Sequence, residues 1–288
     1  MGRVHRLQTV PPFGDLPTPD GVDVVGVDLP VGRLTAYRGL PDGPSRGSVL
    51  LVPGFTGSKE DFRPLVPLLR DAGWSVLAMS RRGQGDSAAP TDPAAYALDE
   101  EAADVVRVAA LVDDGAPVHL LGHSLGGVIA RAAAIASPSA FRSVTMLCSG
   151  PHGWPNRMFL ARRLAAEQGN RALFDAQNPI AIGVADAALD QATRFARMRM
   201  DRSSTVGITT TAAILELPDD TTAALRDTGL PTLVAHGEDD AAWPQVWQHD
   251  MAERLGARYA VIPDSAHSPA VEAPEATARL LDGFLADA

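Results

Sequence analysis

The sequence predicts an α/β protein built on one mostly parallel sheet with helices on both faces. Short apolar runs recur along the chain, and longer segments with helical spacing separate them. This alternation breaks only once, between Gly150 and about Thr205. Strands that return through a helix to a parallel neighbour produce such an alternation, which favours this class over all-helical or all-strand folds.

Eight apolar runs predict an eight-stranded sheet. Several runs are continuous rather than alternating, which is typical of strands buried on both faces. The predicted strands are Val24–Val27, Leu34–Tyr37, Val49–Val52, Val76–Met79, Val118–Leu121, Val144–Leu147, Thr232–Ala235 and Tyr259–Ile262.

Apolar residues at helical spacing predict the helices between these strands. Such patterns cover residues 99–112, 124–137 and 274–286. A further helix is predicted after Ser58, because Ser58 and Asp61 form an N-terminal capping signature.

The same patterns divide the chain into three parts. Residues 1–20 are rich in Pro and Gly without a period, which predicts an irregular N-terminal arm. Residues 21–150 and 206–288 carry the strand rhythm and form the predicted core domain. Residues 151–205 interrupt that rhythm with a polar pattern, which predicts a helical insertion.

Composition excludes several classes of function. The net charge of −10, without a local basic run, argues against nucleic-acid binding. Cys148 is the only cysteine, so an intrachain disulfide or a thiolate zinc cluster is excluded. There is no run long enough for a transmembrane helix, and the first residues lack the apolar core of a signal peptide. We expect a cytoplasmic protein.

The strongest chemical signal is the sequence Gly122-His123-Ser124-Leu125-Gly126. It lies where a predicted strand meets a predicted helix. A serine on such a sharp turn needs small neighbours two residues before and after it. The helix that follows directs free N–H groups at the place where an oxyanion would form. Ser124 is therefore the predicted nucleophile.

With this motif in its strand-and-helix context, the chain resembles the α/β-hydrolase superfamily from about Val22 to the C-terminus. The resemblance also rests on the loop Pro53-Gly54-Phe55-Thr56-Gly57-Ser58 and on Arg82-Gly83-Gln84-Gly85-Asp86-Ser87. It implies that the backbone N–H groups of Phe55 and Leu125 form an oxyanion hole. Pro53 departs from the family, where His usually precedes this glycine. The second loop is structural in that family.

A nucleophilic serine needs a base and an acid that orients the base. His267 follows the last predicted strand in a loop that resembles the family's histidine loop. The acid should follow the preceding strand, in Gly237-Glu238-Asp239-Asp240. Asp240 matches the family's spacing to Pro244, with the adjacent Asp239 as the rival. The order Ser124, Asp240, His267 is the order that this superfamily uses.

The resemblance implies that residues 151–205 form a cap over the site. Methionine and aromatic side chains there can line an apolar acyl pocket. Candidates for substrate binding are His152, Trp154, Met158 and Phe159. The cap also carries eight arginines, most of them expected on solvated helix faces, although they could attract an anionic substrate.

These observations predict a serine hydrolase that cleaves a carboxylic ester with an apolar acyl part, similar to esterases and monoacylglycerol-type lipases. No metal-ligand spacing occurs, and the triad requires neither a metal nor a cofactor. A thioesterase or a C–C bond hydrolase would use the same three residues. A non-catalytic small-molecule-binding protein on this fold is a further alternative. The sequence does not define the oligomeric state.

Overall fold

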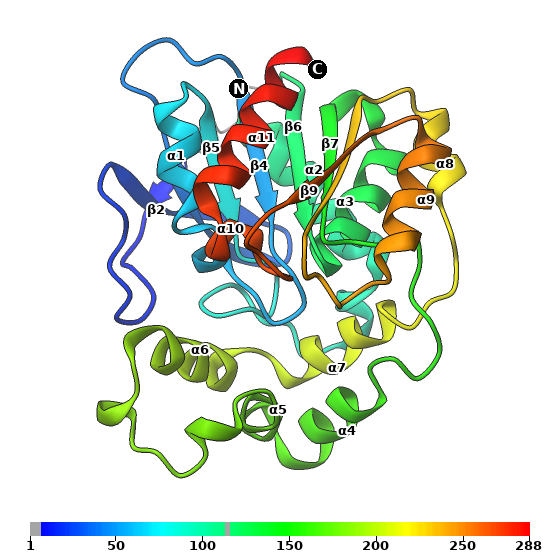
Figure 1. Ribbon diagram of the computed structural model, residues 1–288. Helices are drawn as coiled ribbons and strands as arrows, with labels where there is room; N and C mark the ends of the chain where they lie inside the picture. Colours follow the sequence, from blue (N-terminus) through cyan, green and yellow to red (C-terminus); the bar gives the residue numbers. More distant parts are fainter. Residues whose placement is uncertain (1–6, 113–115) are drawn as a thin grey trace.

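A nine-stranded sheet forms the centre of the computed structural model, which describes residues 7–112 and 116–288 (Figure 1). The first six residues of the predicted N-terminal arm lie outside the described residues. In spatial order the strands are β1 (Gln8–Thr9), β2 (Val22–Leu29), β3 (Gly32–Gly39), β5 (Ser75–Met79), β4 (Ser48–Val52), β6 (Val118–His123), β7 (Phe141–Leu147), β8 (Thr232–Gly237) and β9 (Arg258–Ile262).

The expectation of eight strands is wrong by one short strand. β1 pairs antiparallel with β2 through Gln8 and Thr9, inside the segment predicted to be irregular. Both of its residues are exposed, so it carries no hydrophobic signal. The eight predicted runs all lie within β2 to β9.

The sheet is parallel from β5 to β9 and antiparallel among β1, β2, β3 and β5. Since every parallel pair needs a crossover, the parallel part is where the long helices appear. Within the antiparallel edge, β2 and β3 are instead joined by a short turn between Leu29 and Gly32.

Helices cover both faces of the sheet. α1 (Leu65–Asp71) and α11 (Pro274–Asp287) pack on one face, next to α10 (Pro269–Glu272). α2 (Leu98–Val112), α3 (Leu125–Ala136), α8 (Thr222–Asp227) and α9 (Gln245–Leu255) pack on the other (Figure 1).

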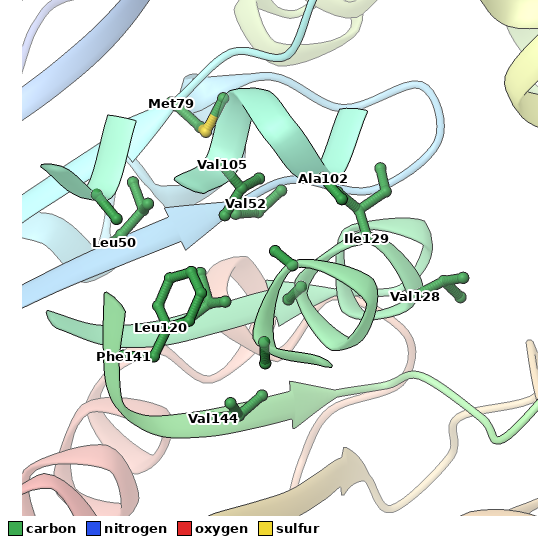
Figure 2. Packing of buried hydrophobic residues seen from close by; sticks show 14 of the residues in the cluster. Leu50, Val52, Met79, Ala102, Val105, Leu120, Val128, Ile129, Phe141 and Val144 are labelled. Atoms are coloured by element: carbon green, nitrogen blue, oxygen red, sulfur yellow. The ribbon is translucent and has the colours of Figure 1, made fainter. Parts of the chain in front are cut away.

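The core follows from the alternation of side chains along each buried strand. In β4, Leu50 and Val52 join the cluster beneath α2 and α3, whereas Val49 and Leu51 join the cluster beneath α1 and α11. Figure 2 shows the first of these clusters, where side chains of β4, β6 and β7 meet those of α2 and α3. Burial on both faces explains the continuous apolar runs.

Four helices lie together beyond one end of the sheet (Figure 1). They are α4 (Phe159–Gln168), α5 (Asn170–Gln177), α6 (Gln191–Arg202) and α7 (Thr205–Ile214). They share a small core of their own, in which Leu173, Phe174, Met200 and Ile208 are buried.

The helix predicted after Ser58 begins later than expected. Lys59–Phe62 forms a short 3-10 turn, and α1 starts at Leu65. Ser58 makes no capping hydrogen bond, because its hydroxyl donates to Glu60 instead. Pro67 lies in the first turn of α1, where a backbone N–H has no helical partner in any case.

Within residues 7–112 and 116–288, none of the helices combines the length and apolar character needed to cross a membrane.

Candidate active site

Ser124 lies at the turn between β6 and α3, where its backbone φ is 56° and ψ is −120°. This conformation is unfavourable for a residue with a side chain and is found mainly at functional sites. The surrounding structure holds it: the Ser124 N–H donates to Leu147 O, and its carbonyl accepts from Gly127 N. Ser124 is 7% exposed.

The two glycines of the motif are required by close backbone packing. A Cβ at Gly122 would lie 2.2 Å from the carbonyl oxygen of Gly126, and a Cβ at Gly126 would lie 2.2 Å from that of Val52. Both contacts are with backbone atoms that have no room to move. The turn therefore excludes any larger residue at either position.

His267 lies in the loop between β9 and α10. Glu272 holds this loop, since its carboxylate accepts hydrogen bonds from the backbone N–H groups of Ala266 (2.7 Å) and Ser268 (3.2 Å). The loop thereby places the imidazole next to the end of β6, 143 residues away in the chain.

The structure brings Ser124, His267 and Asp240 into one hydrogen-bonded chain. The Ser124 hydroxyl lies 3.0 Å from His267 Nε2, and His267 Nδ1 lies 2.9 Å from Asp240 Oδ1. An imidazole that donates from Nδ1 to a carboxylate has Nε2 free to accept a proton. The three side chains therefore have the geometry that proton removal from Ser124 requires.

Asp240, rather than Asp239, contacts the imidazole. Asp240 is 3% exposed, and it also accepts hydrogen bonds from Ala242 N (3.0 Å) and Gln248 Nε2 (3.0 Å). Burial alone would raise the pKa of Asp240, but the hydrogen bonds from His267, Ala242 and Gln248 outweigh it and lower the pKa below its ordinary value. Asp239 is exposed at the surface.

Arg81 and Gln84 orient the loop that contains Phe55. Arg81 Nη2 donates to the carbonyl oxygens of Gly54 (3.1 Å) and Phe55 (3.2 Å), and Gln84 Nε2 donates to the same two oxygens at 3.1 and 2.6 Å. In a trans peptide the N–H points away from the C=O. Because the Gly54 carbonyl faces Arg81 and Gln84, the Phe55 N–H faces the opposite way.

A buried ion pair supports this arrangement. Arg81 Nη1 lies 2.9 Å from Glu101 of α2, and both side chains are almost fully buried. From the sequence, the loop that carries Gln84 is recognisable only as a structural motif. Its glycine-rich pattern does not indicate that Gln84 donates hydrogen bonds to the carbonyl oxygens of Gly54 and Phe55.

His123 is a second residue whose position the sequence analysis missed. Its Nε2–H donates to the backbone carbonyl of His267 at 2.6 Å, and the two rings lie 5.0 Å apart. Burial, and then the neighbouring His267, lowers the pKa of His123 to about 4. His123 is therefore neutral at ordinary pH and keeps its proton on Nε2.

A cavity of about 610 Å³ opens above Ser124 and His267. The loop at Gly54–Gly57 forms one wall, and the region of α4–α7 supplies Arg157, Met158, Gln177, Arg199 and Leu215. Of the four candidates for substrate binding, Met158 lines this cavity.

The other three candidates lie elsewhere. His152 packs against Trp247 of α9 with ring centres 4.7 Å apart and ring planes tilted by 38°, and it lines a different cavity. Trp154 packs against the guanidinium of Arg157 at 4.2 Å. Phe159 begins α4 and is 58% exposed.

The cavity contains more charge than its predicted apolar character suggests. Arg199 is paired with Asp61 at 2.5 Å. Arg157 lies over the ring of Trp243 at 3.8 Å and donates to the carbonyl of Ala242. Burial lowers the pKa of Arg157 to about 10, which leaves it protonated at neutral pH.

Among the described residues, one group has the spacing of metal ligands: His123, Cys148 and His267, with ligand atoms within 4.8 Å of one another. This group does not fit a metal ion. Both ring nitrogens of His267 and Nε2 of His123 already form hydrogen bonds. Burial raises the pKa of the Cys148 thiol well above its ordinary value, which disfavours the thiolate that would bind a metal.

Comparison with known proteins agrees with this fold. A model of the alpha/beta hydrolase family matches residues 49–280. A protein named "Putative carbamate hydrolase RutD" from Variovorax paradoxus is 32% identical over 258 residues, which cover 85% of this chain and 94% of that protein. The chain therefore belongs to the alpha/beta hydrolase family.

Further relatives include esterases. A pimeloyl-acyl-carrier-protein methyl ester esterase from Neisseria meningitidis is 27% identical and matches 88% of this chain and 80% of its own length. A crystal structure from work on carboxylesterases of the thaumarchaeon Nitrososphaera gargenis has a TM-score of 0.74 at 22% identity, covering 91% of this chain and 98% of that one. This last likeness is a likeness of fold.

Proposed function

We propose that this protein is a serine hydrolase that cleaves a carboxylic ester through an acyl-enzyme on Ser124. The observation that carries the proposal is the continuous hydrogen-bonded chain from Ser124 through His267 to Asp240. The strained backbone of Ser124 at the N-terminus of α3 adds support, because such a turn is typical of a nucleophilic serine. Relatives named as esterases agree with this reaction class.

In the first step, His267 Nε2 takes the proton of the Ser124 hydroxyl while Oγ attacks the ester carbonyl. The new imidazolium donates from Nδ1 to Asp240, whose lowered pKa keeps it charged for this role. The carbonyl oxygen becomes an oxyanion, which accepts from the N–H groups of Phe55 and Leu125. One such donor stabilises the transition state by about 3–4 kcal/mol.

The tetrahedral intermediate then collapses. The C–O bond to the alcohol breaks, and His267 returns its proton to the leaving oxygen. The acyl group remains on Ser124. Water next loses a proton to His267 as it attacks the acyl carbon, and breakdown of this second intermediate releases the carboxylic acid and restores the Ser124 hydroxyl.

The cavity suggests the kind of ester. Met158, Leu215 and Val271 offer apolar contacts for the acyl part, and the cavity of about 610 Å³ lies within the usual range for small ligands. In this proposal, the predicted cap of residues 151–205 covers the site, and α7, which follows it, joins its small core through Ile208.

The test is hydrolysis of p-nitrophenyl esters from acetyl to palmitoyl by the wild type and by Ser124→Ala. Ser137→Ala is the matched control, since Ser137 lies at the other end of α3 and its hydroxyl forms no capping hydrogen bond to the 3-10 turn that follows. We expect activity to peak at one chain length, to vanish in Ser124→Ala and to persist in Ser137→Ala. Full activity in Ser124→Ala would refute the mechanism.

Substrate class is decided by the same variants with other substrates. Hydrolysis of thioesters at least ten times faster than that of matched oxygen esters would indicate a thioesterase, and cleavage of a diketone would indicate a C–C bond hydrolase. Tight binding of a small apolar molecule without turnover of any of these would favour a binding protein instead.

A further inference from the structure

A second cavity, of about 250 Å³, shares no lining residue with the cavity above Ser124. Val128 and Ile135 of α3 form its floor together with Leu98 of α2. Ile214 and Leu217, at the end of α7 and just after it, complete the apolar walls. The cavity is therefore suited to a hydrocarbon group.

Two charged side chains line this otherwise apolar cavity: Asp219, which is exposed at the rim, and Arg131 of α3, which is only 3% exposed. Both of its hydrogen bonds come from Nη1, which donates to the carbonyl of Gly150 at 3.1 Å and to the sulfur of Met251 at 3.7 Å. Within the described part of the chain, Nε and Nη2 have no partner.

The other buried arginines differ from Arg131 in one respect. Arg81 is paired with Glu101, Arg82 with Asp104 and Arg197 with Asp186, each at 2.8 to 2.9 Å. Arg131 forms no ion pair with any described residue.

Asp220 is the acid that acts on Arg131 from a distance, but it is already paired with Arg254 at 2.7 Å. Burial lowers the pKa of Arg131 to about 10, so it remains a cation at neutral pH. A buried charge without a counter-ion costs free energy that an anion in the cavity would recover.

We propose that this cavity binds a small apolar monocarboxylate. The carboxylate accepts hydrogen bonds from the free nitrogens of Arg131, whose planar fork matches it, and the chain lies against Val128, Ile135 and Ile214. The single positive charge of Arg131 is neutralised by a ligand with one negative charge. The carboxylate of Asp219 at the rim would repel a second negative charge on the ligand. Because a cavity of about 150 Å³ holds benzene, this one has room for a chain of about six to eight carbons.

The bound ligand would contact both connections between α4–α7 and the sheet. His152 and Gly153 of the first connection and Leu217 of the second line the cavity. The two connections are joined directly, since Gly153 N donates to the carbonyl of Leu217 at 2.8 Å.

The test measures binding of sodium hexanoate by calorimetry, with 1-hexanol and hexylammonium as probes of equal chain length. We expect hexanoate to bind the wild type with one site per chain and the two other probes not to bind. Arg131→Met keeps the shape but removes the charge, and it should weaken hexanoate binding at least tenfold. Without ligand, Arg131→Met should unfold at the same temperature as the wild type or higher, because an unpaired buried charge is gone.

A second variant keeps Arg131 and fills the cavity. Ile135→Trp should also weaken hexanoate binding at least tenfold, and it decides the question if Arg131→Met fails to fold. Equal affinity in the variants would refute the proposal, since a carboxylate product bound near Ser124 would be insensitive to both changes. Absence of hexanoate binding to the wild type would refute it as well. None of these readouts depends on hydrolysis, so failure of the proposed reaction leaves the test intact.

Discussion

Replacement of Gln84 by Met tests how the loop that carries Phe55 is oriented. Gln84 is buried, and its amide donates to the carbonyl oxygens of Gly54 and Phe55 at 3.1 and 2.6 Å. Met has a similar length and volume but no donor. After the substitution, Arg81 alone holds both carbonyls, at 3.1 and 3.2 Å. The Phe55 N–H would then be free to turn from its position.

The expected loss of activity follows from this shared support. Complete loss of one oxyanion donor costs about 3–4 kcal/mol of transition-state stabilisation. Since Arg81 remains, we expect about half of that, or ~1.5–2 kcal/mol. This corresponds to a fall in kcat of about 10- to 30-fold.

The expected change in stability is small for a separate reason. Two neutral hydrogen bonds are lost, at about 1 kcal/mol each. However, Gln84 Oε1 is buried without a partner, and removing such an oxygen recovers about 1–3 kcal/mol. The two effects offset each other, so the free energy of unfolding should stay within about 1 kcal/mol of the wild type.

The assay compares kcat and KM on the best p-nitrophenyl ester with the free energy of urea unfolding. Gln177→Met is the matched control, because it makes the same chemical change at a residue that lines the cavity above Ser124 but forms no hydrogen bond to Gly54 or Phe55 among the described residues. An unchanged kcat in Gln84→Met would refute the orientation argument. A fall in kcat that is accompanied by a large loss of stability would assign Gln84 a structural role instead.

Three further predictions address the histidines and the acid. His123→Phe keeps a ring but loses the donor to the His267 carbonyl, so kcat should fall about tenfold with little change in KM; an unchanged kcat would contradict this positioning role. Asp240→Asn should lower kcat about 10⁴-fold, because an amide favours the wrong tautomer of His267, and a loss below tenfold would exclude Asp240 as the acid. Burial, and then Arg142, lowers the pKa of His119 from 6.5 to about 4. The unfolded chain therefore binds a proton at pH values where the folded chain does not, and stability falls as pH drops from 6.5 towards 4, by about 2 kcal/mol between pH 7 and pH 5 for this residue. Urea unfolding at the two pH values should show a smaller difference in His119→Gln than in the wild type.

Local patterns predicted the strands from β2 to β9 because burial on both faces leaves a continuous apolar run in the sequence itself. The elbow at Ser124 was equally visible, since its glycines are demanded by backbone contacts within a few residues and with the adjacent strand. By contrast, β1 consists of two exposed residues, and such a strand leaves no hydrophobic pattern.

The supporting contacts of the candidate site depend on the tertiary structure. His123 reaches the carbonyl of His267 across 144 residues, and Gln84 reaches Gly54 across 30. In neither pair does the spacing or the residue type indicate from the sequence that the two residues are in contact. The unpaired charge of Arg131 is likewise invisible in a helix of ordinary composition.

The sequence by itself determined the strands, the elbow and the order of Ser124, Asp240 and His267, because those features rest on local backbone sterics and side-chain burial. Only the tertiary structure decided which carbonyls accept hydrogen bonds from Arg81, Gln84 and His123, and which buried arginine has no acidic partner among the described residues. The physical reason is that hydrogen bonds and ion pairs between distant segments depend on the order of strands in the sheet, and strand order is a property of the whole chain.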